Sequence, residues 1–238
     1  MDADPDERAA LVFAGGETAG LERMEHYFAG TRALSRYKET RNGLLGPDYS
    51  SKFSPWLAHG CLSPRRIHAE VRRYEATVTK NDSTYWLVFE LLWREYFRWL
   101  AAKYGDRIFY PGGIRDVDVS TYIDRGALQN WRLGETGQDF IDANMRELLL
   151  TGFMSNRGRQ NVASYLVRDL AIHWRAGAAY FESMLIDYDV YSNWGNWNYA
   201  AGVGTDPRED RYFNPTVQAE RYDRKGRYVR HWLPERYA

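Results

Sequence analysis

Cysteine and long apolar runs are the scarcest features of this sequence. Among 238 residues there is one cysteine, Cys61, which excludes an internal disulfide and is typical of proteins from a reducing compartment. No apolar run approaches the ~20 residues that a membrane-spanning helix needs. The first residues, MDADPDERAALVF, are acidic where a secretory signal would be basic. These absences predict a cytoplasmic protein.

Strand signals are also nearly absent, because β-branched residues rarely alternate with polar ones. The spacing that does occur is helical, with neighbours three and four positions apart. Four apolar residues near the N-terminus show it: Leu21, Met24, Tyr27 and Phe28. The sequence therefore predicts an all-α fold, organised as one helical-bundle domain over 18–238 after a loose lead-in over 1–17.

Several helices can be placed by their start and stop signals. The pairs Ser54-Pro55 and Ser63-Pro64 each put an N-cap residue before a proline at the first helical position. The stretch 83–104 is apolar nearly all round and is followed by Gly105, so it predicts a buried central helix. The remaining expected helical segments are 65–76, 122–133, 140–150, 161–177 and 180–186.

Aromatic residues and arginines are abundant. The chain has 9 Trp, 18 Tyr and 10 Phe, more than a core requires, and many stand beside arginine or asparagine. Such neighbours suit a planar aromatic ligand or nucleic-acid bases. Net charge is zero, which argues against a globally basic nucleic-acid binder. The arginine clusters are either a solvated surface or local contacts to an anion: 64–73, 94–98, 156–159 and 220–230.

Polar residues interrupt the apolar stretch 83–104. Glu90, Trp93, Arg94 and Phe97 are spaced i, i+3, i+4 and i+7, so they share one helix face. One interpretation is an ion pair between Glu90 and Arg94 at a helix crossing. The other is the polar floor of a pocket, where burial would favour the protonated carboxyl and make it a proton donor.

A possible anion site precedes Pro55. The segment 48–55, DYSSKFSP, supplies three serine hydroxyls and a lysine ahead of a helix start. Hydroxyls and amide N–H groups at a helix N-terminus suit phosphate or diphosphate. Serine-proline caps are common, so the pattern alone is weak.

Arginines also open a helix in 152–161, GFMSNRGRQN, where the helix dipole repels them. A carboxylate would compensate, and the segment 187–204, DYDVYSNWGNWNYAAGVG, offers Asp187 and Asp189. One hypothesis pairs Arg159 with one acid and leaves the other acid and Asn193 to bond the edge of a heterocycle. The alternative is a purely structural ion pair.

Four separated blocks together resemble the helical flavin domain of the photolyase/cryptochrome family, and within it the cryptochrome DASH branch. They are residues 35–67, 89–98, 151–175 and 187–215, in the order in which the family has them. The resemblance covers roughly residues 15–236. The family carries an N-terminal α/β domain that holds an antenna pigment, and this sequence begins at about the linker after it. The acidic lead-in favours a naturally short form, for which we expect no antenna pigment.

The resemblance implies a U-shaped FAD inside the bundle. The residues implied to hold its diphosphate and adenosine side are Tyr37, Ser50, Ser51, Lys52, Phe53 and Ser54. Those implied near the flavin are Asn156, Arg159 paired with Asp187, Asp189 at the polar edge of the ring, and Asn193 at N5. An amide can serve N5 in both protonation states, whereas a carboxylate would disfavour the reduced anion.

The resemblance also implies an electron relay that reduces the flavin in light. Trp197 and Trp174 match its first two members. The third falls at Thr121, beside Tyr122, so this chain departs from the family pattern there. Tyr122 or another tyrosine could substitute, or photoreduction could be slow.

The chemistry implied is light-driven electron transfer from reduced FAD to a cyclobutane pyrimidine dimer flipped into a slot. The implied catalytic residues are Glu90, Asn193, Trp197 and Trp174, and no metal is expected. The implied substrate residues are Glu90, Trp93, Arg94, Asn156, Arg157, Gln160 and Tyr199. Duplex-acting photolyases have methionine and tryptophan where this chain has Gln160 and Tyr199. A less apolar slot leaves less energy to offset flipping, which favours single-stranded DNA as substrate.

Two other functions remain as hypotheses. A blue-light photoreceptor would bind flavin and a nucleic acid or protein partner without repairing DNA, and an inactive helical module would bind no flavin. Relatives that act on the other major ultraviolet photoproduct carry histidines in the slot, but none of the five histidines here stands at an implied substrate position. Self-association through an exposed apolar face is a further hypothesis.

Overall fold

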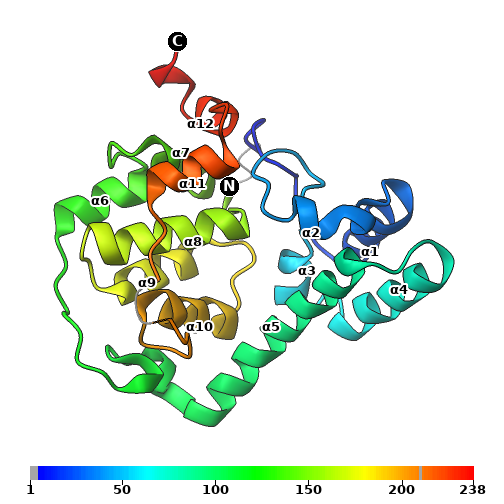
Figure 1. The fold of residues 1–238 in the computed structure, drawn as a ribbon, viewed down its shortest axis with the longest axis horizontal. Coiled ribbons are helices and arrows are strands. Elements are labelled where there is room, and N and C mark those ends of the chain that lie inside the picture. Colours follow the sequence, from blue (N-terminus) through cyan, green and yellow to red (C-terminus); the bar gives the residue numbers. More distant parts are fainter. Residues whose placement is uncertain (1–4, 209–210) are drawn as a thin grey trace. The chain divides into compact units, whose positions relative to one another are not determined.

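The structure is a computed structural model that describes residues 5–208 and 211–238. Within these ranges every regular element is a helix and no strand occurs, which confirms the all-α class. The chain divides into two compact units, here called the N-terminal unit (Ala10–Tyr96) and the C-terminal unit (Phe97–Ala238 with Met1–Ala9). The division falls inside helix α5 (Asp82–Tyr104), and Figure 1 traces the elements in chain order.

The N-terminal unit is built around the apolar stripe that its first helix begins. Met24, Tyr27 and Phe28 are buried, whereas Leu21 packs at the edge of the same core cluster. The stripe is therefore confirmed, although the segment is not one continuous helix. The elements before α5 are α1 (Glu17–Glu25), the π-helical turn η1 (His26–Gly30), the 3-10 turn η2 (Ala33–Arg36), α2 (Tyr37–Thr40), α3 (Ser54–Ala58) and α4 (Pro64–Thr77).

The two serine-proline pairs behave differently. Ser63 is the N-cap of α4 and Pro64 its first residue, as predicted. Ser54 is instead the first helical residue of α3, and Phe53 occupies the N-cap, so that prediction is wrong by one position. Proline fits anywhere in a first turn, because the N–H that it lacks would have no helical partner there. A serine-proline pair therefore predicts the first residue of a helix with an uncertainty of one position.

Helix α5 has the predicted extent but not the predicted burial. Tyr85, Leu92 and Trp99 are 58%, 57% and 71% exposed, at a spacing of seven residues that puts them on one face. The expectation of a helix buried all round is therefore wrong. An apolar helix can be buried on every side, but its sequence does not show whether other helices pack against each of its faces.

The C-terminal unit contains the remaining helices. Helix α10 packs against α9 and α8, and α7 packs against α6, α8 and α12. These elements are η3 (Gly105–Phe109), η4 (Gly113–Arg115), α6 (Arg125–Leu133), α7 (Asp139–Thr151), α8 (Asn156–Ser164), the π-helical turn η5 (Tyr165–Asp169), α9 (Trp174–Met184), α10 (Val190–Ala201), α11 (Pro215–Tyr222), α12 (Arg227–Trp232) and η6 (Pro234–Arg236).

The predicted segments 122–133 and 140–150 correspond to α6 and α7, whereas 180–186 covers the end of α9 and is not a separate helix, and α10, α11 and α12 were not predicted. The segment 161–177 also differs from its prediction. The predicted single helix there is wrong, because α8 passes into η5 and the chain then breaks before α9 begins. Ala171 adopts φ 49°, a left-handed conformation that no α-helix continues through. By contrast α7 ends where predicted, with Gly152 at φ 67° and its N–H bonded to the carbonyl of Leu148.

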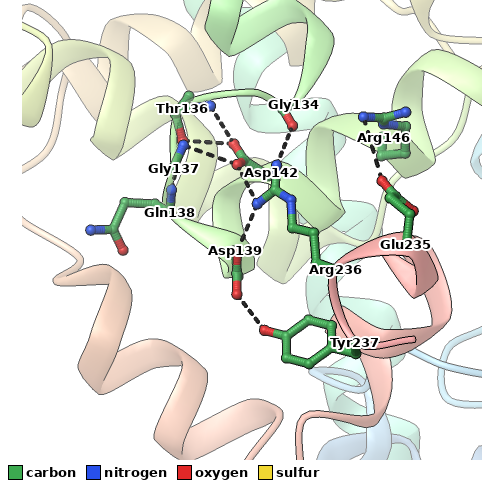
Figure 2. Close-up of polar contacts among 10 residues, drawn as sticks. All are labelled: Gly134, Thr136, Gly137, Gln138, Asp139, Asp142, Arg146, Glu235, Arg236 and Tyr237. Atoms are coloured by element: carbon green, nitrogen blue, oxygen red, sulfur yellow. Dashed lines mark hydrogen bonds and ion pairs between the residues drawn. The ribbon is translucent and has the colours of Figure 1, made fainter.

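The last turn of the chain is fastened to the start of α7, as Figure 2 shows. Asp142 is fully buried and accepts hydrogen bonds from the amide and hydroxyl of Thr136 at 2.8 and 2.6 Å. Arg236 forms ion pairs with Asp142 at 2.9 Å and with Asp139 at 2.6 Å. The hydroxyl of Tyr237 donates to Asp139. We call this group the C-terminal clasp.

Candidate functional site

The predicted site residues are divided between the two units. The N-terminal unit carries the implied diphosphate loop and three of the implied substrate residues: Tyr37, Ser50, Ser51, Lys52, Phe53, Ser54, Glu90, Trp93 and Arg94. The C-terminal unit carries the implied flavin contacts, the relay and the other substrate residues: Asn156, Arg157, Arg159, Gln160, Trp174, Asp187, Asp189, Asn193, Trp197 and Tyr199.

A buried arginine shapes the loop that contains the serines. Arg23, on α1, donates to the carbonyl oxygens of Ser51 at 3.0 Å, Ser50 at 3.2 Å and Pro47 at 2.9 Å, and pairs with Asp48 at 2.9 Å. One guanidinium therefore fixes the path of residues 47–51 through charge-assisted bonds. Sequence reasoning missed Arg23. The signal was a cation between Leu21 and Met24 on an otherwise apolar stripe.

The loop that Arg23 holds presents a set of donors. In the parts of the chain that the structure describes, the hydroxyls of Ser50, Ser51 and Ser54 have no hydrogen-bond partner. Lys52 is almost completely buried, with Nζ 3.1 Å from the ring centroid of Tyr49, and its φ of 55° turns the backbone sharply. Hydroxyls beside a cation suit a diphosphate. These residues fit the phosphate part of FAD.

Glu90 is held by an arginine that sequence reasoning did not consider. Its carboxylate forms an ion pair with Arg41, whose guanidinium also lies 4.8 Å from the ring centroid of Trp86. Arg94 pairs with the adjacent Glu95 at 2.8 Å. The interpretation as a Glu90–Arg94 pair is therefore wrong. An ion pair favours the charged carboxylate, so this arrangement does not support Glu90 as a proton donor.

Trp93, the implied stacking residue, lies in a row of aromatic rings along α5. Its ring is 6.1 Å from Phe89 and 5.4 Å from Tyr96, and both contacts are edge-to-face. Phe89 in turn lies 5.1 Å from Trp86. Edge-to-face packing on two sides restricts the indole and keeps it available as a stacking surface.

In the C-terminal unit, Arg159 donates to both carboxylate oxygens of Asp187, at 3.0 and 2.8 Å, and to the carbonyl of Met154 at 3.0 Å. The predicted ion pair is thus present, although its role toward a flavin remains a prediction. The side chain of Asp187 is only 1% exposed. A buried carboxylate needs a charged partner, and Arg159 supplies it. In return, Asp187 offsets the repulsion between Arg159 and the positive end of the α8 helix dipole.

Asp189 and Asn193, the other residues implied to lie near the flavin ring, stand at the start of α10. Asp189 is the N-cap and accepts from the amide of Ser192 at 2.8 Å. Asn193 is buried, and its side-chain N–H donates to the carbonyl of Ala178 at 3.0 Å. This bond fixes the amide orientation and leaves its Oδ1 as an acceptor, which suits a heterocyclic N–H.

The two matched relay tryptophans are both buried. Trp197 packs so closely on α9 that a Cβ at Gly177 would lie 2.2 Å from its ring, so only glycine fits there. The indole N–H of Trp174 donates to the carbonyl of Pro111 at 2.9 Å. Tyr122, the suggested substitute for the third member, is 58% exposed. Its backbone carbonyl accepts a hydrogen bond from the His173 amide at 2.9 Å.

Three implied substrate residues stand on α8, namely Asn156, Arg157 and Gln160. Asn156 is its exposed first residue, behind the N-cap Ser155, whose hydroxyl accepts from the Gly158 amide at 2.9 Å. Gln160 lies one turn further on, and its Oε1 is buried without a hydrogen-bond partner among the described residues. A buried acceptor without a donor is costly, so Gln160 is suited to bind a ligand N–H.

Guanidinium groups and rings alternate beside these residues. Arg211 lies 4.9 Å from the ring of Tyr199 and 5.9 Å from that of Phe213. Arg157 lies 5.8 Å from Phe213 and 4.6 Å from Tyr222. We call this series, Tyr199–Arg211–Phe213–Arg157–Tyr222, the cation–π ladder. Sequence reasoning missed Arg211, Phe213 and Tyr222, although aromatic residues following arginine in 211–213 are the kind of signal that could reveal them.

The ladder is anchored at Arg211. This residue forms an ion pair with Asp206 and donates to the Tyr199 hydroxyl at 3.2 Å. Burial acts to raise the pKa of Asp206, but hydrogen bonds from Arg211 and from the Arg208 amide outweigh it and hold the pKa below its usual value. The carboxylate thus stays charged and fixes the guanidinium against Tyr199.

The arginine cluster on α4 is different, because two of its arginines are paired with glutamates of the same helix. Arg72 pairs with Glu75 and Arg73 with Glu70, each at 2.7 Å and three residues apart. This cluster is a solvated surface. Among the described residues no group of histidine, cysteine and acidic side chains could hold a metal ion, and no described helix is long and apolar enough to cross a membrane.

Comparison with known proteins identifies the fold. Residues 86–237 match the family described as the FAD-binding domain of DNA photolyase. The cryptochrome DASH of Gloeobacter violaceus is 63% identical over 97% of this chain and 46% of its own length. The crystal structure of Synechocystis cryptochrome superposes with a TM-score of 0.97 at 59% identity, over 99% of this chain and 49% of that one.

A more distant match is a class III photolyase of Agrobacterium tumefaciens, with a TM-score of 0.84 at 34% identity over 94% of this chain and 46% of that one. The chain therefore belongs to the family of the FAD-binding domain of DNA photolyase, whose cofactor is FAD. The expected placement in the cryptochrome DASH branch is confirmed. The chain spans about half the length of the curated relatives that it matches.

Proposed function

We propose that this chain uses reduced FAD and blue light to split cyclobutane pyrimidine dimers in DNA, with a preference for single strands. The observation that carries the proposal is the pair formed by Glu90 and Trp93 on one face of α5. Glu90 is oriented by Arg41 and Trp93 by Phe89 and Tyr96. An oriented acceptor beside an aromatic surface is what a flipped, stacked pyrimidine pair requires.

The FAD of the family supplies, when bound and reduced, the electron that opens the dimer under light. The chain's own residues would hold it. Ser50, Ser51, Ser54 and Lys52 would bind the diphosphate, on the loop that Arg23 fixes. Asp189 and the Oδ1 of Asn193 would face the polar edge of the flavin, with Arg159 and Asp187 supporting them.

Each unit offers groups suited to the substrate. In the N-terminal unit Glu90 would accept a hydrogen bond from a pyrimidine N–H, and Trp93 would stack on the dimer. In the C-terminal unit Gln160 has a buried Oε1 that needs a donor, and Tyr199 and Asn156 are further implied substrate residues. A hydrogen bond to the charged Glu90 would contribute about 1.5–3 kcal/mol. Arg94 and Arg157 would bind nearby phosphates.

Single-strand preference is supported by the cation–π ladder. Alternating guanidinium groups and rings resemble the surfaces on which unpaired bases stack while arginines neutralise the backbone. A polar slot with Gln160 and Tyr199 offers less stacking energy than an apolar one. A substrate that costs nothing to unpair is therefore favoured.

The runner-up function is a flavin photoreceptor that binds a nucleic acid or protein without repair. The ion pair between Glu90 and Arg41 favours it, because a substrate would have to compete with Arg41 for the carboxylate. The cytoplasmic location, the lack of an antenna pigment and self-association all remain predictions. Several curated relatives bear the name cryptochrome DASH, chloroplastic/mitochondrial.

A repair assay distinguishes the two functions. Chemically reduced, flavin-loaded protein is mixed with dimer-containing oligonucleotide, as single strand or as duplex, and illuminated with blue light. We expect the dimer to disappear, and faster from the single strand. Loss at equal rates would refute the strand preference. No loss from either substrate, with reduced flavin present, would assign the chain to the photoreceptor class.

A further inference from the structure

The chain lacks a tryptophan at the third position of the implied relay, where Thr121 stands. Trp174 is only 2% exposed, so a reductant in solution reaches it poorly, and a neighbouring ring that is easier to oxidise and more exposed would complete the relay. This question rests on the proposed light-driven function. All the residues concerned lie in the C-terminal unit.

The ring next to Trp174 is a tryptophan that no part of the implied relay uses. Trp194 lies 5.7 Å from Trp174, with the two ring planes at 79°. In the described residues the other ring beside Trp174 is His173, at 5.9 Å. Imidazole is much harder to oxidise than indole. Trp194 is therefore the ring through which an electron can reach Trp174.

Hydrogen bonding makes Trp194 the easier of the two indoles to oxidise. The N–H of Trp174 donates to a neutral carbonyl, that of Pro111, at 2.9 Å. The N–H of Trp194 donates to the carboxylate of Glu182 at 3.0 Å and lies 3.3 Å from the hydroxyl of Tyr188. A negative charge stabilises the positive charge that oxidation creates, and it offers the proton a place to go.

Tyr188 lies beside the same carboxylate. Burial, together with Glu182, raises its pKa to about 12, so the phenol stays protonated at neutral pH. Its hydroxyl therefore remains a hydrogen-bonding neighbour of the Trp194 indole. Trp194 is 8% exposed, against 2% for Trp174, and Tyr188, which it contacts, is partly exposed.

We propose that Trp194 is the terminal member of the relay and that Glu182 is its proton acceptor. Trp197 would give one electron to the photoexcited flavin, Trp174 would then give one to Trp197, and Trp194 would give one to Trp174. The N–H proton of Trp194 passes to Glu182, which leaves a neutral indolyl radical. A thiol from solution then supplies one electron, and the proton returns from Glu182. The thiol is oxidised to a thiyl radical and loses its own proton to water.

The test is flash photolysis of the flavin-loaded protein with a thiol present, comparing the wild type with Trp194→Phe, Glu182→Gln and Tyr122→Phe. Flavin content and melting temperature are measured for each. Trp197→Phe is the positive control for a broken relay. In Trp194→Phe we expect photoreduction to fall by about tenfold or more. The oxidised tryptophan would take its electron back from the flavin before the thiol could reduce it. In Tyr122→Phe we expect the wild-type rate.

The transient spectrum gives a readout that a structural role would not change. Wild type should end on a neutral tryptophan radical. Glu182→Gln keeps a hydrogen-bond acceptor but cannot take the proton, so the protonated radical cation should persist. Wild-type photoreduction in Trp194→Phe, with flavin content unchanged, would overturn the proposal, as would a neutral radical in Glu182→Gln. Wild type that binds flavin but is not photoreduced would refute the relay while leaving repair by chemically reduced protein as a separate result.

Discussion

Glu90 shows how one contact changes the interpretation of a residue. Its position on α5 suggested a polar group in an apolar helix, and the structure supplies Arg41 as a counter-ion. A carboxylate accepts hydrogen bonds, so the Glu90 side chain can bind the N–H of a pyrimidine. Arg41 thereby becomes part of the proposed substrate site.

At this scale we predict that Glu90→Ala lowers dimer repair on the order of tenfold to a hundredfold, the effect of losing a charge-assisted hydrogen bond. Flavin content should stay at the wild-type level, because the implied flavin contacts are other residues. Repair kinetics and the flavin absorbance ratio measure the two effects. Glu95→Ala is the matched control, since it removes a neighbouring acid that pairs with Arg94. Equal repair in Glu90→Ala and wild type would exclude Glu90 from the mechanism.

At the scale of the element, the all-α class and helices such as α4, α5, α6 and α7 follow from the sequence, whereas α10, α11 and α12 and the partners across the chain do not. The apolar stripe of α1 and the stop at Gly152 depend on local spacing and backbone preference, which a sequence states directly. Arg41, Arg23 and Arg211 were missed, because their partners lie 49, 28 and 12 residues away. The break at Ala171 was missed for a different reason, because alanine normally favours a helix and gives no local signal of a break.

The loop that Arg23 organises gives a second prediction. Arg23→Ala should weaken FAD binding on the order of tenfold, because the carbonyls of 47–51 lose a common donor and the serine hydroxyls lose their arrangement. Fluorescence titration of apoprotein with FAD measures the Kd. Arg72→Ala is the control, since its partner is on its own helix. An unchanged Kd in Arg23→Ala would show that the loop needs no such support.

The same contact predicts a dependence of stability on pH. Burial acts to raise the pKa of Asp48, but bonds from His26 and Arg23 outweigh it and hold the pKa below its ordinary 3.8. In this range the unfolded state binds the proton more tightly, so stability rises with pH. The contribution is complete above about pH 5 and is lost as the pH falls through the folded value. Denaturant unfolding of wild type and Asp48→Asn should converge on acidification, and parallel curves would contradict this.

At the scale of the whole molecule, the net charge is zero, so any attraction to nucleic acid must come from local clusters of positive charge. Arg72 and Arg73 of α4 are paired with glutamates of the same helix, so they contribute little. The cation–π ladder is the surface on which an unpaired strand would find both rings and charge.

This distribution predicts how affinity for single-stranded DNA should vary with salt. Each phosphate contact contributes about 0.7 to the slope of log K against log salt for a single strand. Arg157→Ala should reduce the slope by about that amount and weaken binding, and Arg72→Ala should change neither. Fluorescence anisotropy at several salt concentrations gives both slopes. A full slope in Arg157→Ala would mean that the strand binds elsewhere.

The C-terminal clasp has a consequence for the lifetime of the protein. Asp142 is fully buried and Arg236 is its counter-ion, so any opening of the clasp leaves that charge without compensation. A buried carboxylate without its cation is strongly destabilising. Opening of the clasp would thus loosen the start of α7 and expose further chain to proteases. Digestion should therefore proceed faster once the clasp has opened, so intact and fully degraded molecules should dominate a digest while intermediates stay scarce.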